Sequence, residues 1–589
     1  MAGTLAALLV PKICGIAAVF VGWGYLSARL LDMVRRPESN WSSSLRLPEL
    51  GIIGFGGAYL FAVLAGLVAP LGGAVDWIFA GIGIAGFGWM AAAWFQRRKW
   101  RWADFGWLAA LTLFVAWGTA YTPLNYDAGL YQLQAARYFE SGPLPLGIAN
   151  VHDRLGFNSA WLPISVLCSG SIFGKDGLFL VNGAAILIFL GAIGCHALDQ
   201  YRRGRFGISG ACAGAAVFLF VRASSGVLFS WFSLSPGADL PAAMICCWVL
   251  VAFLALLENA AAGEVHDRDV EIQRWFFVLV TATALAIITK LSQGPVALLL
   301  ALALFLPGAR RVWGRAIAFA VLLVAGWLVQ GLTTSGCAAF PVARSCLAFL
   351  PWTSDPAVAA RQAMVIRSWA RAPGVRPENV PNGFGWLPLW WHRMMPEREF
   401  VWSLARGAAV LAGVAAILMI AVWIGSIANK EKDRANILKP ALLALLVFCA
   451  GAAFWFLEAP DPRFGLGFLI GIPAFVFALA VEVSLQRQGA RQARRLLAAT
   501  LAVLVVWAGL SESRRLHRER GAIASYSWSQ IPVPRLRSMT TSGGVTIRLP
   551  VKGDQCWDEP TPCTPEPGVA GSLHQSTLLG HTMYSHEKQ

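Results

Sequence analysis

Repeated apolar segments of about twenty residues constrain this sequence more than any other feature. Of its 589 residues, 57% are hydrophobic and only 14% are charged, and the mean hydropathy is +0.58. A soluble domain needs far more polar surface to cover its core. In contrast, ~20 apolar residues in a helix cross the ~30 Å hydrocarbon layer of a membrane. We therefore predict an all-α polytopic membrane protein.

We expect about fourteen transmembrane helices, with each end uncertain by ~2–4 residues. The first apolar stretch lacks the charged start and the clear cleavage site of a secretory signal peptide, so it is counted as a span. The predicted spans cover 10–31, 50–70, 75–95, 104–121, 178–198, 207–222, 238–257, 275–289, 294–310, 314–334, 405–427, 439–458, 464–483 and 496–511.

Clusters of lysine and arginine fall in alternate loops between these spans. Because such clusters favour the cytoplasmic side of a membrane, the net charge of +16 is not taken as a sign of nucleic-acid binding. With the clusters in the cytoplasm, both termini, the outer loops 122–177 and 335–404, and the tail 512–589 face the exterior. The clusters are Arg35–Arg36, Arg97–Arg101, Arg202–Arg205, Ala309–Arg315, Lys430–Arg434 and Arg487–Arg495.

The apolar segment Ala160–Gly174 is too short to cross a membrane. If it did cross, the loops on either side of it could not keep the sides just assigned. We therefore predict that it forms a helix lying on the outer membrane surface.

Two pairs of cysteines lie in the predicted outer regions. Cys337 and Cys346 share the large loop, and Cys556 and Cys563 share the tail. An oxidising exterior permits a disulfide in each pair. Free thiols remain the alternative, because spacing alone does not fix pairing.

Charged side chains gather where predicted helices reach the outer side. Asp127 lies in "NYDAGLYQLQAARYF", directly before an amphipathic helix, where an aspartate usually acts as a helix cap. Charges near the hydrocarbon are solvated, paired or functional, and lysine can extend to the interface. Four charged stretches on one side favour a shared site over separate pairings. The other members are Asp239, Lys290, Glu458, Asp461 and Arg463.

Three short motifs in these stretches resemble the GT-C class of membrane glycosyltransferases, in the branch with protein mannosyltransferases and lipid A aminoarabinose transferases. They are "YDAGLYQLQAARYF" with Asp127 and Tyr131, "ITKLSQGPVALLL" with Lys290, and Pro462–Phe464 before a glycine- and proline-containing span. The second motif has two residues inserted after its lysine. The chain is also similar to a group of bacterial membrane proteins with "GFNSAW"-type stretches, which implies the bacterial inner membrane.

The resemblance implies a division of the chain into three parts. Residues 104–511 would form the GT-C-like catalytic membrane domain, and 512–589 an extracytoplasmic tail. The loop with the aspartate follows the fourth predicted helix, whereas typical members place it after the first. Residues 1–103 would therefore be transmembrane helices additional to the usual core.

The resemblance also implies a reaction and its participants. The donor is a sugar on a polyprenyl phosphate, and the acceptor is a lipid, a glycan or a protein. Asp127 would be the general base of an inverting transfer, with Asp153 as the second carboxylate. Lys290 and Arg463 would bind the donor phosphate. The acceptor or pocket residues would be Tyr131, His152, Arg154, Asp239, Glu458 and Asp461, although "HDR" at 152–154 could instead be a self-paired loop.

Other functions are weighed against this one. A polymerase or ligase of surface polysaccharide would use similar lipid-linked donors, and the sequence hardly distinguishes it from the GT-C glycosyltransferase. A transporter or flippase is disfavoured because no internal repeat is evident and the charges lie at the outer face. The sequence has no nucleotide-binding motif and no metal cluster with ligand-like spacing. No cofactor is predicted from the sequence, and a divalent metal remains the alternative, because some GT-C relatives use a divalent ion, which Asp127 with Asp153 could hold.

Overall fold

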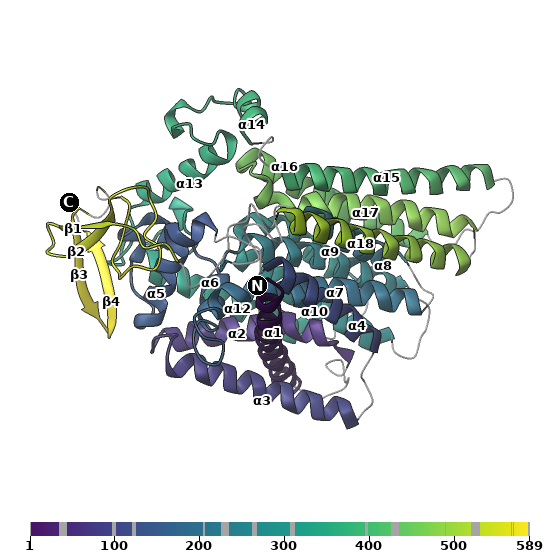
Figure 1. Cartoon of the computed structure of the whole chain (residues 1–589), viewed down its shortest axis with the longest axis horizontal. Coiled ribbons are helices and arrows are strands. Elements are labelled where there is room, and N and C mark those ends of the chain that lie inside the picture. Colours follow the sequence, from purple (N-terminus) through teal and green to yellow (C-terminus); the bar gives the residue numbers. More distant parts are fainter. Residues whose placement is uncertain are drawn as a thin grey trace.

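The computed structural model is mostly helical, with a small β-structure at the C-terminal end (Figure 1). Eleven helices in its described part are long and apolar enough to cross a membrane, so the chain is a polytopic membrane protein whose membrane part is helical. The structure describes the chain except for 1, 34–43, 97–101, 120–124, 204–206, 225–234, 262–267, 307–312, 395–398, 426–434, 489–490, 520–530, 567, 569–570 and 587–589.

The eleven helices match predicted spans. They are α1 (Ala2–Met33), α2 (Leu47–Gly66), α3 (Ala74–Gln96), α7 (Gly177–Arg202), α9 (Asp239–Ala261), α10 (Arg268–Thr289), α12 (Trp313–Ser335), α15 (Glu399–Gly425), α16 (Ala435–Glu458), α17 (Pro462–Gln488) and α18 (Arg491–Glu519).

Three further predicted spans form helices that are not long and apolar enough to be counted with these eleven. Span 104–121 is α4 (Trp102–Thr119), and span 207–222 is the shorter α8 (Ile208–Ala223). Span 294–310 divides into the 3₁₀ helix η5 (Leu291–Val296) and α11 (Ala297–Ala303). Pro295 lies inside η5, and a proline has no N–H for a regular α-helical turn. The expected uniform span is therefore wrong at this place.

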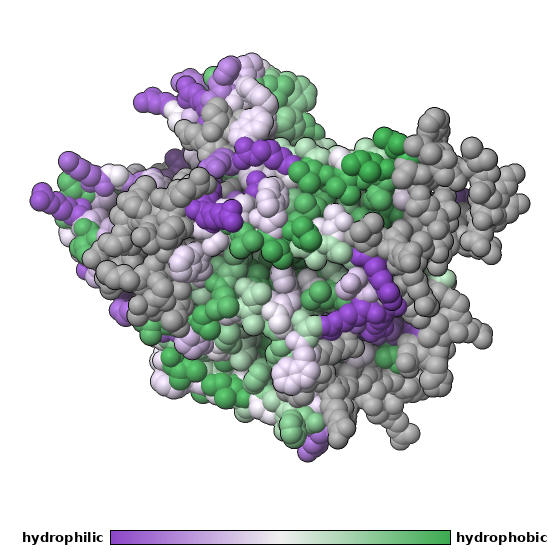
Figure 2. Space-filling view, turned by 45° about the vertical axis from the view of Figure 1, so that its right-hand side comes forward, coloured by the Kyte–Doolittle hydropathy of each residue, from purple (hydrophilic) through white to green (hydrophobic). Residues whose placement is uncertain are grey.

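The bundle has a protein-buried centre and an apolar periphery. The most apolar windows of α7 and α9 are entirely buried inside the protein, whereas only 28% of that of α3 and 22% of that of α18 are buried. A helix that is apolar on all sides must be covered by protein or by lipid. Figure 2 shows hydrophobic side chains spread over the middle of one face of the protein, which fits contact with lipid.

One end of the bundle carries the long loops, and we call it the loop face. The first loop contains the π-helix η2 (Ala128–Gln132), then α5 (Leu133–Ser141), η3 (Ile148–Asn150), η4 (Asp153–Gly156) and α6 (Trp161–Val166). The second contains η7 (Ala343–Ser345), α13 (Pro356–Arg371), η8 (Pro377–Asn379) and α14 (Leu387–Met394), and the disulfide Cys337–Cys346.

The described part of the tail, from residue 531 to 586, is attached to the first loop. Strands β1 (Leu536–Thr540) and β2 (Thr546–Pro550) form one antiparallel hairpin, and β3 (Leu573–Leu578) and β4 (His581–His586) form another. A second disulfide joins Cys556 to Cys563. Beside β4, the Leu146 N–H donates to the Thr582 carbonyl at 2.9 Å, and the Tyr584 N–H donates to the Leu146 carbonyl at 2.8 Å. The tail therefore lies against the loop face (Figure 1).

The segment with the short helix α6 was predicted to lie on the outer membrane surface, but the helix lies inside the protein. Trp161, Ile164 and Val166 are buried, and α6 packs against α2, α5 and α7. The prediction of a non-crossing segment is consistent with its six-residue helix, but its apolar side chains contact protein instead of the membrane interface. Neighbouring helices supply the apolar surroundings that the sequence pattern had assigned to lipid.

The other end of the bundle is tied together by buried ion pairs. Arg274 Nε at the start of α10 donates to Glu49 Oε2 in α2 at 3.0 Å, and Arg46 pairs with Asp199 near the end of α7. The N-terminal helices therefore pack into the same core as the rest. Three of the six basic clusters used for the orientation lie outside the described residues, and the other three are only partly described. The three outside are 35–36, 97–101 and 430–434.

Candidate functional site

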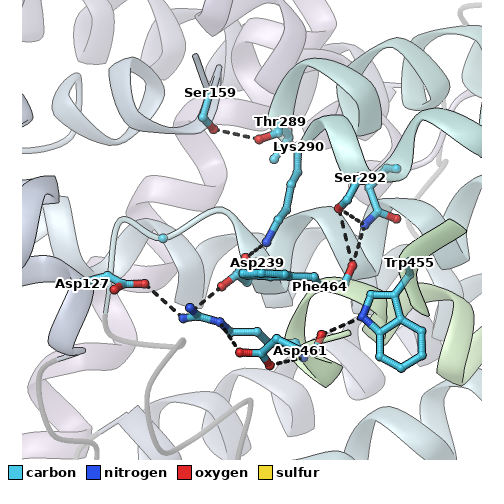
Figure 3. Close-up of polar contacts among 12 residues, drawn as sticks. Asp127, Ser159, Asp239, Thr289, Lys290, Ser292, Trp455, Asp461 and Phe464 are labelled. Atoms are coloured by element: carbon cyan, nitrogen blue, oxygen red, sulfur yellow. Dashed lines mark hydrogen bonds and ion pairs between the residues drawn. The ribbon is translucent and has the colours of Figure 1, made fainter. Parts of the chain in front are cut away.

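Five charged side chains from four separate segments meet at the loop face (Figure 3). They come from the residue before η2, the start of α9, the residue after α10, and the turn before α17 together with the first residues of that helix. We call them the charged cluster: Asp127, Asp239, Lys290, Asp461 and Arg463. The sequence had placed each of them on this side separately, and the structure brings them together.

Arg463 is the centre of the charged cluster. Its Nη1 donates to Asp127 Oδ2 at 3.0 Å and lies 3.7 Å from Asp239 Oδ2. Its Nε lies 3.1 Å from Asp461 Oδ2. The guanidinium also lies over the ring of Trp369 in α13, 4.9 Å from the ring centroid. This one arginine therefore joins the first loop, α9, α13 and α17.

The turn before α17 fixes the position of Arg463. The carboxylate of Asp461 is fully buried, and its Oδ1 accepts a hydrogen bond from the Arg463 N–H at 3.0 Å. The indole of Trp455 in α16 donates to the Asp461 carbonyl at 2.7 Å. Because Pro462 is the first residue of α17, its missing N–H costs that helix no hydrogen bond. This short, rigid connection thus holds the Arg463 guanidinium toward the other side chains of the charged cluster.

Lys290 approaches from the opposite side. Helix α10 ends at Thr289, and Lys290 adopts an extended backbone before η5 begins. Its ammonium donates to Asp239 and lies over the Phe464 ring, 3.8 Å from the centroid. Figure 3 shows the lysine reaching Asp239 from its own helix end. Asp239 therefore lies between the two cations.

The carboxylate of Asp127 does not cap the helix that follows it. It makes no capping hydrogen bond with the described residues, and the Asp127 N–H instead donates to Asn125 Oδ1 at 2.8 Å. The helix begins as a π-helix, a form that often occurs at functional sites. The structure thus directs Asp127 toward Arg463, and the helix-cap alternative fails.

The charged cluster is partly accessible to solvent and carries an excess of negative charge. Three carboxylates face two cations, and the side chains of Asp127, Asp239, Lys290 and Arg463 are 16–21% exposed. Tyr131 in η2 lies nearby, and burial together with the charge of Asp127 raises the pKa of its phenol. The tyrosine is therefore a neutral hydrogen-bonding group at neutral pH.

His152, Asp153 and Arg154 form a second group within the same loop. Burial lowers the pKa of His152 to about 3, and burial raises the pKa of Asp153 to about 6. His152 Nε2 lies 3.7 Å from Asp153 Oδ1. Arg154 acts electrostatically on Tyr131, so the two groups are neighbours.

Other predicted residues lie apart from the charged cluster. Glu458 pairs with Arg367 of α13, and both side chains are half exposed.

A cavity of about 400 Å³ beside α5 is lined by Asp76, Arg137, Glu140 and other described residues, none of which was predicted as a site residue.

The two aromatic rings that contact the cations, Trp369 and Phe464, were not among the predicted site residues. Phe464 belongs to the motif already quoted. Trp369 lies at the C-terminal end of the amphipathic α13, and that helix pattern was the available signal.

Fold and site together define a polytopic membrane protein with a charged cluster at one end of its helices. A family model described as a domain of unknown function, DUF8201, matches residues 7–470. The chain belongs to this family, and the match includes the N-terminal helices and every member of the charged cluster. Comparison with curated proteins gave no match, and neither did comparison with solved structures.

Proposed function

We propose that this protein is a GT-C-like glycosyltransferase of the bacterial inner membrane. It moves a sugar from a polyprenyl phosphate to a lipid, glycan or protein acceptor at the extracytoplasmic face, with inversion. The observation that carries this proposal is the hydrogen bond between Asp127 and Arg463 at the loop face, with Lys290 beside it. It combines a carboxylate suited to be a base with two cations suited to a phosphate.

The reaction follows from these roles. The acceptor oxygen forms a bond to the anomeric carbon as the bond from that carbon to the phosphate oxygen breaks. The acceptor proton goes to the Asp127 carboxylate, and the polyprenyl phosphate leaves with the electron pair. Arg463 can bind phosphate oxygens with two N–H groups, and Lys290 as a point charge. A single displacement inverts the anomeric centre.

Donor binding and activation of the base are coupled in this proposal. In the ligand-free protein the cations of the charged cluster contact carboxylates, so an incoming phosphate competes with Asp127 and Asp239 for them. When Arg463 turns to the phosphate, the hydrogen bond from its Nη1 to Asp127 Oδ2 is lost. That carboxylate oxygen can then accept the hydrogen bond of the acceptor hydroxyl, the geometry that a general base needs.

The position of the charged cluster supports transfer over transport. Its residues lie at helix ends and in the turn between α16 and α17, whereas transporter sites typically lie near the middle of the bilayer. A lipid-linked sugar has its reactive carbon at the interface, which is the depth that these helix ends provide.

Contacts at the two ends of the chain support the fourteen-span topology. Lys12 near the start of α1 pairs with Asp176 in the first loop, and the tail binds the same loop. Two ends on one face require an even number of crossings. The eleven long helices give an odd number, and the predicted spans 104–121, 207–222 and 294–310, which contain α4, α8 and α11, make fourteen.

The deciding experiment replaces Asp127 by asparagine. Because an amide cannot accept the proton, transfer from a lipid-linked sugar should fall by at least ~100-fold, while expression and thermal stability stay near wild type. The matched control is Asp355→Asn, since Asp355 Oδ1 does cap α13 by accepting from the Ala357 N–H at 2.8 Å. Asparagine serves well as a cap, so the control should keep its activity. Near-normal turnover by Asp127→Asn would exclude this base and redirect the search to Asp153 or Asp239.

A further inference from the structure

Three side chains that could bind a metal meet where the first loop contacts the tail. His152 and Asp153 come from the segment around η4, and Glu566 comes from the tail. One potential ligand atom from each lies within 4.8 Å of the other two. Both loop residues are buried, and Glu566 is partly exposed.

The spacing of these atoms suits a metal ion better than direct hydrogen bonding. His152 Nε2 lies 3.7 Å from Asp153 Oδ1, which is too far for a hydrogen bond. Two ligands at ~2.1 Å from a tetrahedral Zn²⁺ lie about 3.4 Å apart. A small movement of the side chains would therefore place both atoms on one ion.

An unsatisfied buried oxygen points to the same conclusion independently. Asp153 is 2% exposed, and its Oδ1 makes no hydrogen bond in the part of the chain that the structure describes. The same holds for the buried Glu566 Oε2. Buried polar atoms without partners are rare, because each loses its hydration without compensation.

The competing interpretation is a purely ionic contact. Arg361 Nη2 lies 3.5 Å from Glu566 Oε2, and both side chains are about half exposed. This contact leaves Asp153 Oδ1 without a hydrogen bond. An exposed pair of this kind also contributes little to stability.

We propose that His152, Asp153 and Glu566 bind a divalent transition-metal ion, with Zn²⁺ as the best fit. One imidazole nitrogen and two carboxylates are common zinc ligands, and water would complete the coordination. Because Glu566 belongs to the tail and the other two to the first loop, the ion joins the two segments. Asn150, two residues before His152, already donates to the Tyr584 carbonyl of β4 at 3.0 Å.

This site is separate from the charged cluster and does not depend on the proposed reaction. None of its ligands belongs to that cluster, and its test measures bound metal instead of turnover. The pair named from the sequence as able to hold an ion, Asp127 with Asp153, shares only Asp153 with this set.

The experiment measures zinc bound to the full chain, purified in detergent through a tag without histidine. After incubation with Zn²⁺ and removal of the free ion, elemental analysis should give about one Zn²⁺ per chain. Glu566→Gln and His152→Ala should each reduce this at least ~10-fold. Glu566→His, which supplies a new ligand, should recover binding. The control Glu378→Gln changes an exposed carboxylate in the second loop and should leave the zinc content unchanged.

A second measurement guards against variants that misfold. Zn²⁺ should raise the thermal unfolding midpoint of the wild type, and a chelator should reverse the rise. Glu566→Gln should show the wild-type midpoint without metal and no response to Zn²⁺. Wild-type protein with no more zinc than Glu566→Gln, or full zinc retention by both ligand variants, would overturn the proposal.

Discussion

At the scale of single residues, Asp239 changes most in importance. The sequence indicated it only as a pocket residue, yet its carboxylate lies between Lys290 and Arg463. A carboxylate in this position pairs with both cations while the donor is absent. It also keeps their side chains oriented toward the place where a phosphate would bind.

This arrangement predicts different effects of one substitution on stability and on donor binding. Lys290→Met leaves Asp239 with the more distant Arg463 and should lower the free energy of unfolding by about 2–4 kcal/mol. That is less than for a fully buried pair, because the lysine side chain is 21% exposed. Adding Asp239→Asn should restore at least half of the loss. Thermal unfolding in detergent measures the loss of stability in Lys290→Met and its recovery in the double variant.

Donor affinity should not recover in the same double variant. Loss of an ionic contact to phosphate typically costs ~1.5–3 kcal/mol, or about 10–150-fold in affinity, with or without Asp239→Asn. Arg463→Ala should weaken donor binding to a similar extent. Unchanged donor affinity in Lys290→Met and in Arg463→Ala would refute the phosphate-binding role of both cations.

The residues of the charged cluster could be predicted from the sequence, but their pairings could not. Asp127, Lys290 and Arg463 were identified because charges at helix ends near hydrocarbon are rare. Asp127 and Arg463 are 336 positions apart, and no local pattern relates them. Trp369 was missed for the same reason, since its partner comes from a distant turn.

At the scale of elements, the contact between η2 and the tail depends on a glycine. A side chain at Gly129 would come within 2.5 Å of the Trp557 ring, and the Gly129 carbonyl accepts a hydrogen bond from the Trp557 N–H at 2.9 Å. Only glycine allows this close approach of the tail to the π-helix.

We therefore expect Gly129→Val to displace the tail from the first loop. Limited proteolysis should then cut the tail at least ~10-fold faster than in the wild type, because access requires local opening. The control is Gly142→Val, at a residue with extended backbone and no heavy atom within 4 Å of the added carbon. Equal proteolysis rates for the two variants would contradict the role given to Gly129.

Long helices could be predicted from the sequence better than short elements. A run of apolar residues needs no partner to be recognised, and for this reason eleven of the fourteen predicted spans matched long apolar helices. Whether an apolar segment contacts lipid or protein depends on its neighbours, which explains the error at α6. The hairpins of the tail have short strands with mixed polarity, and packing against the loop decides their structure.

At the scale of the whole molecule, the two ends of the chain share one face, and we predict from the sequence that this face lies outside. A reporter that is active only in the cytoplasm, fused after Gln589, should therefore give no signal above background. The reason is the distribution of basic clusters among alternate loops. The same reporter placed in the predicted cytoplasmic loop 430–434 serves as the positive control. Strong activity of the C-terminal fusion would reverse the assigned orientation.

The attachment of the tail to the first loop also sets an order in time. Asn150 and its acceptor Tyr584 are 434 positions apart in the chain. At ~5–20 residues per second, a ribosome needs roughly 20–90 s to add that length. Throughout this interval the newly made loop lacks the segment that covers it in the finished protein. The contacts around Asn150 and Leu146 are completed only after nearly all of the polypeptide exists, so a nascent or prematurely terminated chain does not contain them.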